Sequence, residues 1–219
     1  LQGGDGGRRV NPAALLLYRA FSHLLSFALG LKCAIAPPFR MKRQARTMDA
    51  IIEQQTPQDL DAIEDLLDRA FGKDRHAKTA YRFRDHTPPV EGLSLVARQD
   101  RRLVGTIRFW PAVIVTGDGQ RTEALLLGPI AVDPELKGVG IGRALMRAGL
   151  EKARETGHRL VILVGDFDYY SRLGFERVPS GALRFPGWVD ESRVLYMNLE
   201  PGAFGNRSGR LIPVDQARD

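Results

Sequence analysis

The pattern of apolar and polar residues from residue 51 onward predicts a domain of short strands and amphipathic helices. Residues 51–55 are a short strand candidate. Thr56 and Pro57 then start a helix, because a hydroxyl at the N-cap and a proline at the first helical position both favour a helix start. Apolar side chains follow at helical spacing until Gly72, which can take the left-handed conformation that ends a helix. They are Ile63, Leu66, Leu67, Ala70 and Phe71.

The next part of the chain predicts an antiparallel sheet. Residues 76–85 are basic and polar and suggest a second short helix, a candidate wall of a substrate site, which the prolines of residues 87–89 end. Two apolar runs, 93–98 and 103–115, are joined by four polar residues, a length that suits a hairpin. Residues 123–132 form a third run, so the sheet has several antiparallel strands before the chain changes character.

The third run is interrupted by Gly128 and Pro129. Proline removes a backbone donor and glycine removes a side chain, so the pair predicts a bulge, a sheet edge, or a strand that separates from its neighbour. A separated strand leaves backbone groups available to a ligand. A plain structural bulge is the alternative.

A glycine-rich turn follows, and it leads directly into a helix. The turn comprises Lys137, Gly138, Val139, Gly140, Ile141, Gly142 and Arg143. Alternate glycines let the backbone approach a ligand closely, and the free N–H groups and positive dipole end of a helix start favour phosphate oxygens. The turn fits neither a Walker loop nor the dinucleotide fingerprint. By itself a glycine turn is also compatible with a purely structural role, so its neighbours decide the interpretation.

The neighbours of the turn complete a strand, helix and strand. The helix that begins at Ile141 has one apolar face and ends at Gly157, and residues 160–164 form an uninterrupted apolar strand of the kind that is covered on both faces. We therefore expect one parallel strand pair. Arg143 lies in the first helical turn, near enough to reach a bound phosphate.

Charge and composition restrict the class of protein. The chain has 219 residues, a net charge of +6 and one cysteine, Cys33. Neither a disulfide framework nor a structural zinc site is supported, and a reducing cytoplasm fits. The positive charge belongs to residues 1–47, whereas the remainder is nearly neutral and makes no case for nucleic acid.

Residues 1–47 differ from the rest of the chain. Residues 13–31 are largely apolar but contain Arg19 and His23, which weakens a membrane span. We expect the segment to be a disordered or non-essential leader, with a targeting segment or an anchor as alternatives. Residues 48–200 are then the folded domain, and residues 201–219 a polar tail that adds little to the fold.

Two motifs and the order of the elements closely resemble the GCN5-related N-acetyltransferase (GNAT) superfamily over about residues 50–200. The motifs are VDPELKGVGIGRALM and, further along, VGDFDYYSRLGF. The resemblance implies a mixed α/β (α+β) fold, with a mostly antiparallel sheet, a splayed parallel strand pair and flanking helices. It also implies acetyl-CoA as cosubstrate, with its pyrophosphate on residues 137–143.

The resemblance assigns individual positions. Lys137, Gly140 and Gly142 occupy the family pattern Arg/Gln-x-x-Gly-x-Gly/Ala, although a lysine lacks the planar geometry of arginine. The matching strand end, along which the pantetheine arm pairs, is Ile130, Ala131 and Val132. An amide there can also stabilise the oxyanion of a tetrahedral intermediate.

Tyr170 matches the family pattern Tyr-x-x-x-Gly-Phe and is the expected catalytic acid. A departing thiolate, whose thiol has a pKa of about 8.5, can accept a hydrogen bond or a proton from a phenol of pKa about 10. The alternative is that Tyr170 only packs against the cosubstrate. Tyr169 is either structural or substrate-facing. No spacing selects a general base among Glu123, Asp133, His158, Asp166 and Asp168.

The resulting hypothesis is a cytoplasmic N-acetyltransferase that moves an acetyl group from acetyl-CoA to a primary amine by direct attack in a ternary complex. The amine is a small molecule or a peptide, and no metal, nucleic acid or membrane takes part. The alternative is a non-catalytic acyl-CoA sensor with the same fold. The last strand can pair within one chain or between two, so a homodimer stays open. Phe185, Pro186 and Trp188 are either core residues or the lining of an acceptor pocket.

Overall fold

A single mixed sheet organises the part of the chain that the computed structural model describes, residues 50–77 and 87–217. Its strand order is β1-β2-β3-β4-β5-β8-β6, and β9 pairs with both β3 and β7. The strands are β1 (Ile51–Gln54), β2 (Leu95–Gln99), β3 (Arg102–Thr116), β4 (Arg121–Val132), β5 (Leu160–Val164), β6 (Glu176–Arg177), β7 (Leu183–Arg184), β8 (Val194–Asn198) and β9 (Gly209–Pro213).

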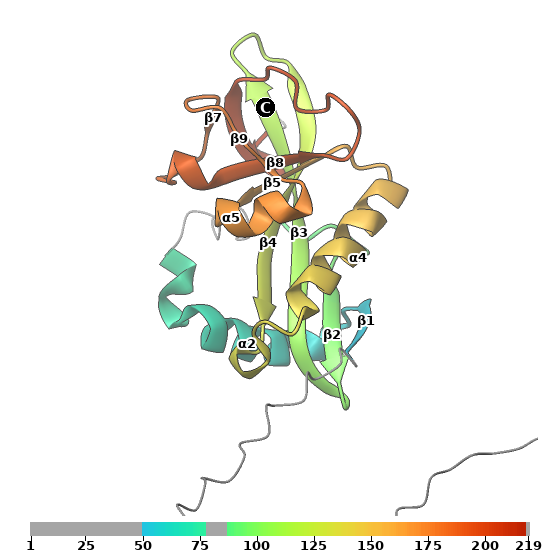
Figure 1. Cartoon of the computed structure of the whole chain (residues 1–219). Helices are drawn as coiled ribbons and strands as arrows, with labels where there is room; N and C mark the ends of the chain where they lie inside the picture. The colour runs from blue at the N-terminus through green and yellow to red at the C-terminus, as the bar shows by residue number, and fades with distance from the viewer. Residues whose placement is uncertain (1–49, 78–86, 218–219) are drawn as a thin grey trace, which may run out of the picture. The chain divides into compact units, whose positions relative to one another are not determined.

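Three α-helices and six 3-10 turns accompany the sheet in the described residues (Figure 1). The helices are α2 (Leu60–Phe71), α4 (Ile141–Glu155) and α5 (Phe167–Tyr170). The 3-10 turns are η1 (Pro57–Asp59), η2 (Lys73–Ala77), η3 (Pro134–Leu136), η4 (Ser171–Leu173), η5 (Glu191–Arg193) and η6 (Val214–Ala217). The predicted helix over 76–85 is represented only by the end of η2, because residues 78–86 lie outside the described residues, as do residues 1–49.

Local sequence signals account for the element boundaries. The carboxylate of Asp59 accepts hydrogen bonds from the backbone N–H and the hydroxyl of Thr56, which fixes the predicted helix start. Gly72 has a φ of 84° at the end of α2. The β2–β3 hairpin turns through Asp100 and Arg101, which both have positive φ, as a two-residue hairpin turn requires.

The two faces of the sheet are covered differently. Helix α4 lies over β2 and β3 (Figure 1) and contributes Leu145, Met146 and Leu150 to the larger core cluster. Glycines permit the close approach, since a Cβ on Gly149 would lie 2.7 Å from the Phe109 ring. Helix α2 packs through Ile63, Leu66 and Leu67 against residues on the opposite face. The sheet is therefore covered by different helices on its two faces.

The expectation that residues 201–219 add little to the fold is wrong. Strand β9 pairs antiparallel with β3 from Ala112 to Thr116, beyond the point where β2 ends. Phe204 is 1% exposed and, with Leu211, joins a core cluster under β3, β4 and β5. The apolar spacing of Leu211 and Ile212 is too short to stand out in a polar segment, so only the pairing reveals the strand.

Candidate active site

The parallel strands β4 and β5 pair only at the start of their length. Leu125 lies opposite Val161 and Leu126 opposite Ile162, and among the described residues no further pair joins the two strands. Strand β4 continues to Val132 with β3 as its partner. The chain therefore has the separated parallel pair that the family resemblance implies, and the separation begins just before the Gly128-Pro129 interruption.

The hydrogen-bond register of β4 decides which backbone groups face the separation. The amide of Asp133 donates to the carbonyl of Val104 on β3. In an antiparallel ladder successive residues alternate between the partner strand and the opposite edge. Ile130 and Val132 therefore direct their backbone groups toward the open edge, whereas Ala131 directs its own to β3 and packs its side chain beneath α2.

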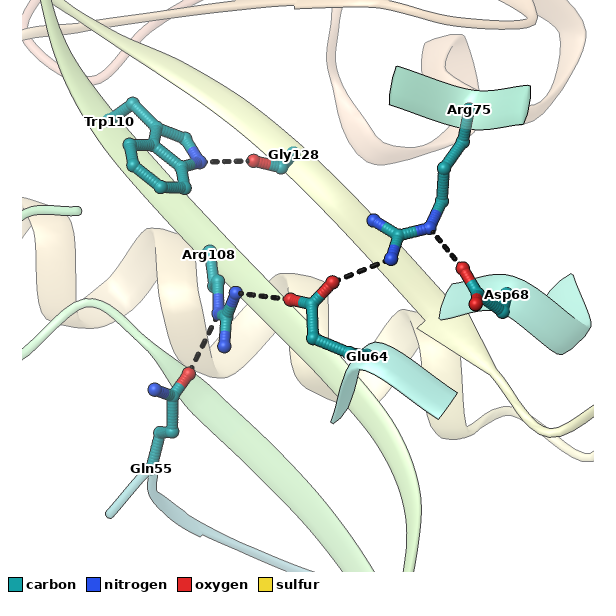
Figure 2. A network of polar contacts seen from close by, with 7 residues as sticks. All are labelled: Gln55, Glu64, Asp68, Arg75, Arg108, Trp110 and Gly128. Carbon is teal, nitrogen blue, oxygen red and sulfur yellow. Dashed lines mark hydrogen bonds and ion pairs between the residues drawn. The ribbon is translucent and has the colours of Figure 1, made fainter. Parts of the chain in front are cut away.

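The interruption itself is a bulge. Register between β3 and β4 shifts between Ile107 and Phe109, and the Gly128–Pro129 peptide bond is cis. The indole Nε1 of Trp110 donates a buried hydrogen bond of 2.6 Å to the carbonyl oxygen of Gly128 (Figure 2). The register shift leaves this carbonyl without a partner in the ladder, and the indole supplies one. The Trp110 side chain, which lies on the α2 face of the sheet, therefore stabilises the bulge.

The glycine turn adopts the backbone that its sequence predicts. Gly138 and Gly140 have φ values of 88° and 98°, which other residues rarely adopt, and Gly140 is the N-cap of α4. Arg143 and Lys137 are exposed. The first-turn N–H groups of α4 have no intrahelical partner, and with the helix dipole they form a site suited to an anion.

Tyr170 ends α5, directly after β5. Its ring packs edge-on against Phe175, with ring centroids 5.7 Å apart. It also lies against Gly165, because a Cβ there would be 2.2 Å from the ring. Burial, together with the neighbouring Tyr169, raises the pKa of Tyr170 to about 12. Tyr170, Ile130 and Val132 are all partly buried and all pack against the larger core cluster.

Two of the five candidate bases lie at the paired end of β4 and β5. Glu123 precedes the paired residues of β4, and His158 precedes β5. Burial lowers the pKa of His158, and the charge of Glu123 partly offsets this, so the imidazole is neutral at pH 7. However, Glu123 and His158 both lie where β4 and β5 are paired, away from the part where the two strands separate.

Two of the three remaining candidates, Asp133 and Asp166, have structural roles in the described residues. Burial alone would raise the pKa of Asp133, but hydrogen bonds from the Glu135 amide and Arg69, with the charge of Arg102, lower it overall. Its carboxylate also accepts a hydrogen bond from Arg102. Asp166 caps α5 by accepting from the amide of Tyr169, and Asp168 is exposed. Asp133 and Asp166 therefore already have partners within the fold.

A polar network that sequence reasoning missed lies on the α2 face beside the bulge (Figure 2). Arg108 of β3 donates from Nε to Gln55 at 2.8 Å and from Nη1 to Glu64 of α2 at 3.4 Å. Arg75 of η2 binds the same Glu64 and donates from Nε to Asp68 at 2.7 Å. The arginines are buried and the carboxylates half-exposed, so the network ties α2 and η2 to the sheet. Its partners are far apart in sequence, and no local motif indicates them.

The network predicts unequal stability losses. In Glu64→Gln combined with Asp68→Asn, a guanidinium that is 3% exposed loses two negative charges, and we expect unfolding free energy to fall by roughly 2–4 kcal/mol. Arg75→Met removes the buried charge and leaves carboxylates that water can reach, so it should cost roughly 1 kcal/mol. Urea unfolding of the variants measures both, and equal losses would contradict the buried-charge explanation.

The two aromatic residues after β7 have different environments. Phe185 is partly buried against the core cluster beneath β3, β4 and β5, whereas Trp188 is 84% exposed. Phe185 therefore follows the core interpretation. Trp188 does not follow it, because its side chain is exposed at the surface of the described domain.

The described residues show neither a metal-binding cluster nor a membrane-spanning helix. No group of three or more histidine, cysteine, aspartate or glutamate side chains there could hold a metal ion. Within the same residues, every helix is too short or too polar to cross a membrane.

These features define an acyl-CoA N-acyltransferase fold, and the chain belongs to the GNAT family of acetyltransferases. The family model for the acetyltransferase (GNAT) domain matches residues 52–178, which begin within β1 and end just after β6. This range contains the glycine turn, the separated strands and Tyr170.

Individual relatives agree with the family assignment. The chain is 33% identical over 140 residues to the uncharacterised N-acetyltransferase YhbS of Escherichia coli K12, covering 63% of this chain and 81% of YhbS. A crystal structure of E. coli YhbS in complex with CoA has a TM-score of 0.63 and 30% identity, covering 78% of this chain and 92% of YhbS. A GNAT acetyltransferase of Brucella melitensis in complex with acetyl-CoA has a TM-score of 0.58 and 26% identity, covering 78% and 99% of the two chains.

Proposed function

We propose that this protein transfers an acetyl group from acetyl-CoA to a primary amine by direct attack within a ternary complex. The observation that carries the proposal is the separation of β4 from β5 beside the glycine turn. The open edge of β4 offers the backbone groups of Ile130 and Val132 to an extended arm such as pantetheine. The adjoining start of α4 offers N–H groups to a diphosphate.

Different residues of the glycine turn are proposed to have different roles in binding the diphosphate. Gly138 and Gly140 give the backbone its shape, and the amides of residues 140–143 supply donors. Exposed Arg143 and Lys137 add positive charge beside these donors. This division follows the family pattern, and the CoA and acetyl-CoA in the structures of two relatives support an acyl-CoA ligand.

The reaction requires charge stabilisation at two atoms. When the amine nitrogen attacks the thioester carbon, negative charge develops on the carbonyl oxygen, and the open-edge amide of Ile130 or Val132 is the proposed donor to it. Collapse of the intermediate breaks the C–S bond and leaves a thiolate. Tyr170 is the proposed hydrogen-bond donor to that sulfur.

The raised pKa of Tyr170 refines this role. A phenol of pKa about 12 stays protonated at neutral pH. Proton transfer from it to a thiolate whose conjugate acid has a pKa of about 8.5 is uphill, so Tyr170 stabilises the sulfur by donating a hydrogen bond while it retains its proton. The proton that ends on CoA then comes from the attacking amine, by way of solvent.

The amine is proposed to approach from the face of Arg108 and Trp110. The glycine turn and Tyr170 lie with the core cluster on the α4 side, which leaves the opposite face for the acceptor. On that face the bulge and the polar network lie together (Figure 2). The network residues are therefore proposed to contribute to the choice of the acceptor.

A non-catalytic acyl-CoA sensor is the second candidate. It is favoured by the roles of four candidate bases in the described residues: Asp133 and Asp166 have structural partners, and Glu123 and His158 lie at the paired end of β4 and β5. An enzyme of this design relies on water to take the proton from the amine. The two functions share the donor site and differ only in turnover.

Two measurements test the proposal. Millimolar acetyl-CoA should raise the melting temperature of the chain, as required of a ligand that prefers the folded state. Release of free thiol should then depend on an amine from a panel of amino acids, polyamines, aminoglycosides and peptides, with amine-free reactions as control. The absence of a thermal shift contradicts the donor site, whereas a shift without amine-dependent thiol release favours the sensor.

A further inference from the structure

Tyr169, the neighbour of Tyr170, has its hydroxyl at the start of α4. A Cβ built on Gly142 would lie 3.3 Å from that hydroxyl oxygen and 3.5 Å from Cγ2 of Val132. Tyr169 comes from α5, Val132 from the end of β4 and Gly142 from the first turn of α4. One side chain therefore reaches from the β5 side of the separation to its β4 side, at the glycine turn.

The two consecutive tyrosines have different environments. Tyr170 packs into the core cluster, whereas Tyr169 is 42% exposed, and their rings meet edge to face with centroids 5.0 Å apart. The Asp166 carboxylate accepts a hydrogen bond from the backbone N–H of Tyr169 and so fixes the first turn of α5. The short helix thus holds one tyrosine inward and directs the other toward the glycine turn.

The Tyr169 hydroxyl is available as a donor. Among the residues that the structure describes, none forms a hydrogen bond with it, and the absence of a side chain at Gly142 leaves it room beside the helix start. Burial raises the pKa of Tyr169, and the charge of Arg143 acts in the opposite direction, so the phenol keeps its proton at neutral pH. A protonated phenol can donate to an anion.

We propose that Tyr169 is a donor-binding residue whose hydroxyl donates a hydrogen bond to a diphosphate oxygen of acetyl-CoA. This inference rests on the proposed function, because it places the diphosphate at the first turn of α4. An anion held by the N–H groups of that turn lies within reach of a hydroxyl already in contact range of Gly142. The Tyr169 ring also spans the point where the cosubstrate passes from the turn into the strand separation.

The proposal separates the roles of adjacent residues. Tyr170 acts at sulfur and affects the chemical step, whereas Tyr169 acts at the diphosphate and affects affinity. A hydrogen bond to a charged group is one of the stronger kinds in proteins. Loss of the Tyr169 hydroxyl should therefore raise the Kd and KM for acetyl-CoA and leave kcat unchanged.

The test compares Tyr169→Phe with the wild-type chain by calorimetric titration with acetyl-CoA and with S-acetylpantetheine, which lacks the diphosphate. We expect Tyr169→Phe to weaken acetyl-CoA binding about 10-fold or more and to leave S-acetylpantetheine binding unchanged. Tyr196→Phe is the matched control, because it removes a phenol hydroxyl that is bonded to Glu176.

Each outcome has one interpretation. Unchanged acetyl-CoA affinity in Tyr169→Phe overturns the inference, and so does an equal loss with both ligands, which would indicate ring packing instead of a bond to the diphosphate. If the wild-type chain binds no acetyl-CoA, the proposed function fails first and this inference falls with it. A loss confined to acetyl-CoA supports the assignment.

Discussion

Gly140→Asp should abolish measurable binding of acetyl-CoA. The residue has a φ of 98°, a conformation that costs a non-glycine residue roughly 1–3 kcal/mol. Its new carboxylate would also stand at the N-cap of α4, where the diphosphate is proposed to bind, and like charges repel there. Together these effects should raise the Kd by at least about 100-fold, measured by calorimetric titration.

Gly157→Asp is the matched control for this substitution. Gly157 follows α4 at its other end, has a φ of 84° and has open space where a Cβ would lie. The variant therefore carries comparable backbone strain and the same charge, without proximity to the turn. Thermal unfolding of both variants separates a folding defect from a binding defect. Acetyl-CoA affinity that is equal in the two variants would contradict close backbone approach at Gly140.

Tyr170→Phe should lower kcat by roughly 100-fold and change acetyl-CoA affinity little. The substitution keeps the ring that packs against Gly165 and Phe175 and removes only the proposed donor to sulfur. Rapid-mixing measurements of a single turnover, with Kd measured separately, distinguish the chemical step from binding. An unchanged single-turnover rate would remove the proposed role, and a large loss of affinity would indicate that the hydroxyl binds instead.

The pH dependence of Tyr170 follows from its raised pKa. Because the folded value of about 12 lies above an unfolded value of about 10, the neutral phenol stabilises the fold below pH 10, and this contribution is lost as the pH rises toward 12. Between pH 7 and 10 the wild-type rate should therefore show no decline due to this residue. A decline near pH 10 that disappears in Tyr170→Phe would contradict the burial of the phenol.

Features that depend on a few consecutive residues could be predicted from the sequence. The helix start at Thr56, the left-handed glycines of the turn and the bulge at Gly128 and Pro129 all follow from local backbone preferences. The position of Tyr170 after β5 follows from its motif. Each of these features is decided within one turn or one strand, so long-range packing does not change it.

Features that depend on register or on distant partners could not be predicted. Ala131 belongs to the expected cofactor strand, but its backbone faces β3, and only the ladder reveals this. Arg108 and Glu64 meet across the sheet and a helix, and their spacing in sequence carries no signal. Glu123 and His158 are chemically suitable bases, yet the register places them at the wrong end of the strands.

The pairing of β9 with β3 also has a consequence for handling the protein. Without residues 201–217, β3 would keep β4 on one edge but lose β9 from the other edge between Ala112 and Thr116, and Phe204 and Leu211 would no longer cover the apolar surface beneath it. An uncovered strand next to apolar surface is a template on which further chains can pair. A chain shortened at residue 200 would therefore be prone to aggregate, even though it retains the whole glycine turn and Tyr170.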